Sequence, residues 1–129
     1  MQWIILIGDD NLSLETFEKM EYPNIKDVVM VEDTEKRIVV DYEDGYVFFD
    51  YVPEIINDYE EDDLEQLIKI VPFKMPHFIM LTYSSKEILG KILRQENFPK
   101  NLYVDDDYGA IVLVGEFVDA LNEWHNLKK

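Results

Sequence analysis

The chain has 129 residues, and its 28 Asp and Glu against 12 Lys and Arg give a net charge of −16. Hydrophobic residues make up 47% and aromatic residues 13%, enough for a packed core, so the charge does not imply intrinsic disorder. The absence of Cys excludes a disulfide scaffold, a thiol enzyme and a cysteine-based zinc site. The excess of acids argues against direct nucleic-acid binding through a basic face.

The N-terminal part predicts a strand followed by a short helix. The apolar run Trp3 to Ile7 ends at Gly8, which is typical of a strand buried on both faces. This run is too short for a secretory signal core or a membrane helix, so we expect a cytoplasmic protein without membrane attachment. Ser13 can cap a helix with the inward positions Leu14, Phe17 and Met20.

Three strands are predicted next, over residues 25–31, 36–42 and 46–52. The last two are joined by Glu43-Asp44-Gly45, a hairpin signal because Gly tolerates the positive φ of a tight turn. A short helical or loop segment begins at Pro53 and ends near Tyr59.

The second half predicts further helices and strands. Asp62 or Asp63 can cap a helix with Leu64, Leu67, Ile68 and Val71 inward, and a strand covers 78–83. Ser84 and Glu87 fit a capping box for a helix with the inward face Ile88, Leu89, Ile92 and Leu93. Strands over 102–105 and 110–114 then form a hairpin, and a final helix starts near Glu116.

The two halves resemble each other in element order and in their hairpins. Val40-Asp41 and Gly45 match Val104-Asp105 and Gly109 at a constant offset. We therefore predict a single α+β domain over residues 1–129, with a mixed or largely antiparallel sheet and helices on one face. A tandem βαββα duplication, with repeats over 1–61 and 76–127, is one interpretation of this pattern.

The excess negative charge lies entirely in the first half. Residues 1–65 hold 20 acids and four bases, whereas residues 66–129 hold eight of each. Between Arg37 and Lys69 there are eleven acids and no base, and Tyr residues are interleaved with them. Carboxylates and Tyr together suit recognition of Lys and Arg. The predicted partner-binding residues are Asp41, Tyr42, Asp44, Asp58, Tyr59, Glu60, Glu61, Asp62 and Asp63; a solvated face that only keeps the protein soluble is the alternative.

Chemistry-bearing motifs are scarce elsewhere. The five glycines form no phosphate-binding loop, the two His have no metal-ligand spacing, and neither Ser84 nor Ser85 lies in a nucleophile elbow. Asp105-Asp106-Asp107 can offer oxygen ligands to Mg²⁺ or Ca²⁺, although Asp is also an ordinary turn residue.

The leading hypothesis is a non-enzymatic acidic protein, without a cofactor, that binds and inhibits a basic protein partner. Immunity proteins against basic nuclease toxins and proteins that mimic the charge of DNA have this profile. One alternative is a divalent-metal-dependent enzyme that uses Asp41, Asp105, Asp106 or Asp107. A further alternative is a regulatory module that self-associates through a strand edge. The sequence leaves the oligomeric state open.

Overall fold

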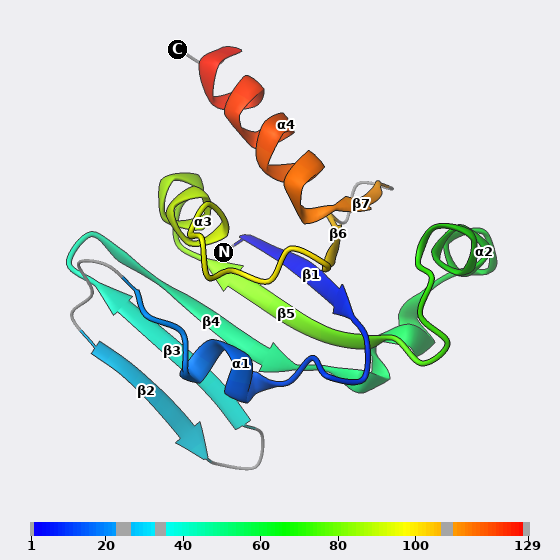
Figure 1. The fold of residues 1–129 in the computed structure, drawn as a ribbon, viewed down its shortest axis with the longest axis horizontal. Helices are drawn as coiled ribbons and strands as arrows, with labels where there is room; N and C mark the ends of the chain where they lie inside the picture. Colours follow the sequence, from blue (N-terminus) through cyan, green and yellow to red (C-terminus); the bar gives the residue numbers. More distant parts are fainter. Residues whose placement is uncertain (1, 23–26, 33–35, 107–109, 128–129) are drawn as a thin grey trace.

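A computed structural model describes residues 2–22, 27–32, 36–106 and 110–127, which form one antiparallel sheet with helices packed against it (Figure 1). The seven strands lie in the order β2-β3-β4-β5-β1-β6-β7, and every neighbouring pair is antiparallel. They are β1 (Gln2–Gly8), β2 (Asp27–Glu32), β3 (Lys36–Tyr42), β4 (Gly45–Tyr51), β5 (His77–Tyr83), β6 (Tyr103–Asp105) and β7 (Ile111–Leu113). The helices are α1 (Leu14–Glu18), the 3₁₀ helix η1 (Pro53–Asp58), α2 (Glu61–Ile70), α3 (Lys86–Leu93) and α4 (Val114–Leu127). The predicted α+β class is confirmed.

The sheet has a hydrophobic core on each face, because β1, which lies between β5 and β6, is apolar on both sides over residues 4–7. Ile4 and Leu6 belong to the larger core, and Ile5 and Ile7 belong to the smaller one. The larger core packs against α1, α3 and α4, and includes Phe17, Ile38, Val40, Phe49, Leu81, Ile88, Ile92 and Val104. The smaller core packs against η1 and α2, and includes Leu67, Val71, Phe78 and Ile111.

The prediction that the helices share one face of the sheet is therefore wrong for η1 and α2. In Figure 1, α2 stands at one end of the molecule, away from α1, α3 and α4. The physical reason lies in β1, whose apolar side chains from Ile4 to Ile7 alternate between the two faces and need cover on both. None of the helices within the described ranges combines the length and the apolar character needed to cross a membrane.

The strand order does not support the tandem duplication. In the first half, β4, the second strand of its hairpin, lies beside β5. In the second half, β6, the first strand of its hairpin, lies beside β1. If β3 corresponded to β6 and β4 to β7, then β7 and not β6 would lie beside β1. The observed strand order therefore lacks the symmetry of a tandem repeat. Gly109, one of the residues that suggested the repeat, lies outside the described residues.

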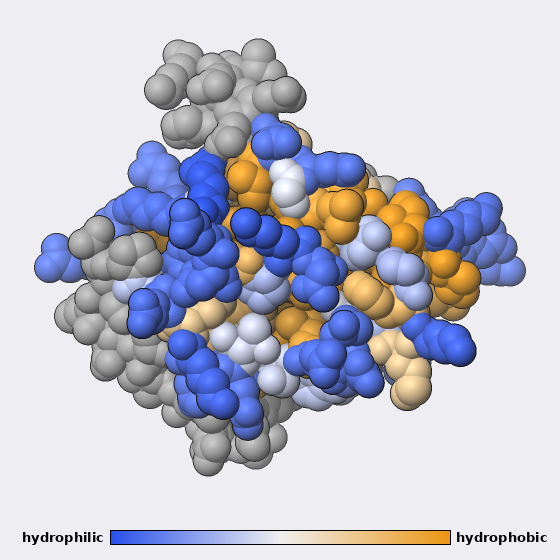
Figure 2. Space-filling view, in the orientation of Figure 1, coloured by the Kyte–Doolittle hydropathy of each residue, from blue (hydrophilic) through white to orange (hydrophobic). Residues whose placement is uncertain are grey.

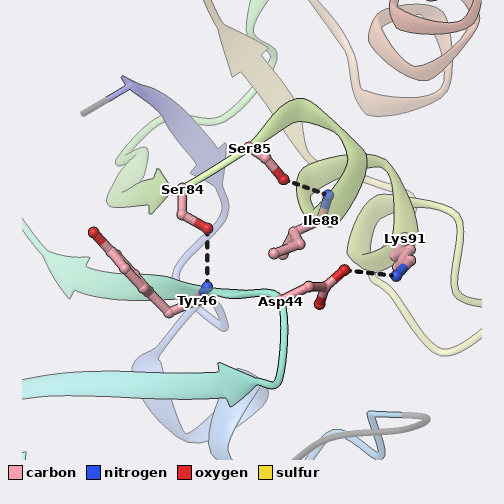
Figure 3. A network of polar contacts seen from close by, with 6 residues as sticks. All are labelled: Asp44, Tyr46, Ser84, Ser85, Ile88 and Lys91. Carbon is pink, nitrogen blue, oxygen red and sulfur yellow. Dashed lines mark hydrogen bonds and ion pairs between the residues drawn. The ribbon is translucent and has the colours of Figure 1, made fainter.

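The start of α3 differs from the predicted capping box by one residue (Figure 3). Ser85 is the N-cap, and its hydroxyl accepts a hydrogen bond from the backbone N–H of Ile88 at 3.3 Å. The hydroxyl of Ser84 instead accepts a bond from the backbone N–H of Tyr46 at 2.9 Å. Ser84 therefore joins the β3–β4 hairpin to β5, and the predicted role for Ser84 and Glu87 is wrong.

The hairpin turn packs tightly against the first turn of α3, so Gly45 cannot carry a side chain. A Cβ atom at this position would lie 2.3 Å from both Ile88 Cδ1 and Ser84 Oγ. We expect Gly45→Ala to lower the free energy of unfolding by about 1–3 kcal/mol, since the crowded atoms must move apart. Urea denaturation measures this change.

Gly115 in α4 provides the matched control, because a Cβ atom there would meet nothing within 4 Å. Gly115→Ala should raise the free energy of unfolding by about 0.5 kcal/mol through its better helix propensity. Equal effects of the two substitutions would contradict the packing described for the hairpin turn.

Tyr22 and Tyr42 are both buried in the larger core but differ in hydrogen bonding. The hydroxyl of Tyr22 donates to the carbonyl of Phe17. The hydroxyl of Tyr42 has no hydrogen-bond partner among the described residues. Burial raises the pKa of both phenols; the charge of Asp44 adds to the rise at Tyr42.

Removing these two hydroxyls should therefore have opposite effects on stability. We expect Tyr42→Phe to raise the free energy of unfolding by up to about 1 kcal/mol, because it removes a buried polar group that gains nothing from folding. Tyr22→Phe should lower it by about 1 kcal/mol, since a hydrogen bond is lost. Thermal denaturation of both variants at neutral pH makes the comparison, and destabilisation by Tyr42→Phe would show that its hydroxyl is satisfied.

Candidate functional site

The acidic residues from Asp58 to Asp63 form one exposed surface where η1 passes into α2. Their side chains are exposed, and Figure 2 shows hydrophilic residues over the outer end of α2 with hydrophobic residues beside it. Glu60 is the N-cap of α2, so the cap lies two or three residues before the predicted position at Asp62 or Asp63. Acids in the first helical turn interact favourably with the helix dipole, which stabilises this end of α2.

Apolar side chains on the other side of this segment fix it to the sheet. Those that pack into the smaller core are Ile55, Ile56, Tyr59, Leu64 and Leu67. The backbone N–H of Val52 donates to the carbonyl of Phe78 at 3.1 Å and attaches the start of η1 to β5. Ile68 is 71% exposed, so its predicted inward position is wrong, although Leu64, Leu67 and Val71 do face the core.

The other predicted partner-binding residues lie elsewhere. Asp44 precedes β4 and Asp58 ends the helix that follows it, so a seven-residue strand of about 20 Å separates them. Asp44 also forms an ion pair with Lys91 on α3, with 3.5 Å between Oδ2 and Nζ (Figure 3). Asp41 is half-buried on β3. Tyr42 is only 5% exposed, because it alternates with Ile38 and Val40 toward the larger core, so it is not a surface residue.

Beside the acidic surface, a cavity of about 260 Å³ opens between the sheet and the η1–α2 segment. Its floor is a row of cross-strand neighbours on four adjacent strands. Ile5 on β1 is paired with Met80 on one side and with Asp105 on the other, and Asp105 is paired with Ile111. Trp3 lines the same face two residues along β1.

The walls of the cavity come from η1, from α2 and from Tyr59 in the short link between them. They are formed by Ile55, Asp58, Tyr59, Asp63 and Gln66. Three of the lining residues are thus carboxylates, contributed by η1, α2 and β6, and no lining residue is Lys, Arg or His. Such a cavity has a negative potential and an aromatic and aliphatic lining, a combination that suits an organic cation.

Asp105 is the most deeply placed of these acids. It is 9% exposed, and the hydroxyl of Tyr59 donates to its Oδ2 at 2.8 Å. The ring of Tyr59 also packs against Phe78, with 6.1 Å between ring centroids. The bond joins β6 to the chain between η1 and α2, so it fixes one wall of the cavity to the floor.

The predicted partner-binding residues include Asp58, Tyr59 and Asp63 of the cavity lining, but not Trp3 or Asp105, which line the same cavity. Asp105 lies 46 residues from Tyr59, and only strand pairing brings it under η1. One signal for Asp105 is present in the sequence. It ends a predicted strand directly after Val104, so its side chain lies on the face opposite that apolar residue.

The metal hypothesis gains no support from the part of the chain that the structure describes. Within it, no three His, Asp or Glu side chains are close enough together to hold a metal ion. Asp106 accepts a hydrogen bond from the backbone N–H of Ala110 at 3.2 Å, which suits a turn residue. Asp41 lies on β3, away from the β6–β7 hairpin, and Asp107 lies outside the described residues.

Comparison with protein-family models, with curated protein sequences and with solved structures gave no match for this chain.

The bond between Tyr59 and Asp105 should contribute measurably to stability, because its acceptor is charged and almost buried. We expect Tyr59→Phe to lower the free energy of unfolding by about 1.5–3 kcal/mol. Tyr51→Phe is the control, since Tyr51 is 42% exposed and should change stability by less than about 0.5 kcal/mol. Urea denaturation of both variants is the measurement; equal small effects would mean that the bond does not hold the cavity together.

Proposed function

We propose that the protein is a non-enzymatic binding protein whose acidic surface at η1 and α2 engages a basic protein partner. The observation that carries this proposal is the convergence of exposed acids with a negatively charged cavity at one end of the sheet. Inhibition of the partner, as by an immunity protein in the cytoplasm, is the role that fits a small acidic chain best.

The local charge favours a protein partner over a nucleic acid or another anion. Phosphate groups would meet Asp58, Glu60, Glu61, Asp62 and Asp63 on the surface, with no base between Arg37 and Lys69. Lys and Arg side chains of a partner would instead be attracted over a distance of about one Debye length, roughly 8 Å at physiological ionic strength. Complementary charge of this kind raises the association rate and selects the partner.

The alternative is a surface that serves solubility alone, and charge reversal separates the two. The test compares the purified wild-type protein with the variant Asp58→Lys with Glu61→Lys, each immobilised and exposed to lysate from the source organism. We expect a basic protein to be retained near one-to-one by the wild type and eluted by a salt gradient. The variant should retain it at least about tenfold less, because two attractive contacts become repulsive.

The matched control is Glu18→Lys with Glu87→Lys, which changes the net charge equally at exposed positions on α1 and α3. This control should retain the partner nearly as well as the wild type. Equal retention by both double variants, or retention that salt does not weaken, would contradict the proposal.

A further inference from the structure

We propose that the cavity between the sheet and the η1–α2 segment receives the guanidinium group of an arginine side chain from the basic partner. This inference rests on the proposed function and assigns the contact that anchors the complex.

The size of the cavity favours a side chain over a larger ligand. Its volume of about 260 Å³ holds several waters, at roughly 30 Å³ each. It lies below the roughly 300–1,000 Å³ that is usual for sites of drug-sized ligands. A single long side chain therefore fits this space.

The charges are graded from the mouth of the cavity inward. Asp58 and Asp63 are exposed on the walls, whereas Asp105 on the floor is 9% exposed. An approaching cation would meet the exposed pair first and the buried carboxylate last. Asp105 accepts a hydrogen bond from Tyr59 and adds its negative charge to the floor of the cavity.

The lining distinguishes arginine from lysine. Trp3 and Tyr59 supply aromatic surface, on which a planar guanidinium stacks better than an ammonium does. Guanidinium is also the more weakly hydrated of the two, and its fork matches a carboxylate with two parallel hydrogen bonds. Ile5, Met80 and Ile111 provide apolar surface for the methylene stem.

The test uses small probes in place of the partner. Nα-acetyl-arginine amide is titrated into the ¹⁵N-labelled protein, and the backbone amide signals of Ile5 and Asp105 are compared with those of α1. Nα-acetyl-citrulline amide has nearly the same shape as the arginine probe but no charge. Nα-acetyl-lysine amide has the same charge but no planar guanidinium group. We expect the arginine probe to shift the cavity signals saturably, at least fivefold more tightly than either of the other two.

Two variants locate the binding. Asp58→Asn with Asp63→Asn should weaken the arginine probe at least fivefold, because both lining acids lose their charge. Glu54→Gln with Glu65→Gln removes the same charge from exposed positions on η1 and α2 outside the lining and should change affinity less than twofold. All four residues are exposed, so both variants should fold. Amide signals of α1 at their wild-type positions in each variant check this.

Several outcomes would overturn the inference. These are binding of the lysine or citrulline probe as tightly as the arginine probe, equal losses in the two variants, and the absence of a saturable shift at the cavity.

Failure of this inference is distinguishable from failure of the proposed function. If the charge-reversal variant loses the partner while the arginine probe does not bind, the acidic surface binds the partner without this anchor. If the probe binds while retention survives charge reversal, the cavity is a cation site and the proposed function is wrong.

Discussion

The antiparallel pairing of β1 with β5 is the constraint on which both cores and the cavity depend. The two strands are paired over all seven residues, ending with Gly8 opposite His77. Because side chains alternate between the faces of a strand, a shift of one residue would exchange the contents of the two cores. The same register sets Ile5 opposite Met80, while β6 adds Asp105 on the other side of Ile5. The floor of the cavity is thus a direct consequence of how the central strands align.

Most strands and helices could be predicted, because their signals are local. The Glu43-Asp44-Gly45 turn and the alternation on either side of it define the β3–β4 hairpin. Local signals do not say which face of the sheet a helix covers, so the position of α2 was not predicted correctly. The sequence did contain the relevant constraint: a strand buried on both faces, such as β1, requires a second layer.

Only the part of the site whose residues are contiguous in the sequence could be predicted. A dense acidic run marks the surface from Asp58 to Asp63, because charge density is visible in a short window. The contribution of Trp3 and Asp105 depends on pairing across β1 and β6, which no short window contains. The same limit explains the error at Ser84: its hydroxyl bonds to a residue 38 positions away, whereas a capping box assumes a partner within one helical turn.

The fold accounts for only part of the negative charge at this end of the molecule. Glu61, Asp62 and Asp63 lie in the first turn of α2, where acids interact favourably with the helix dipole and need no ligand to explain them. Asp58, Asp63 and Asp105 reach one cavity from three elements, where like charges repel and where Asp105 has lost most of its hydration. The hydrogen bond from Tyr59 offsets part of this cost. Asp105 adds little to the exposed charge of the molecule because it is only 9% exposed, so solubility does not explain its place at the cavity.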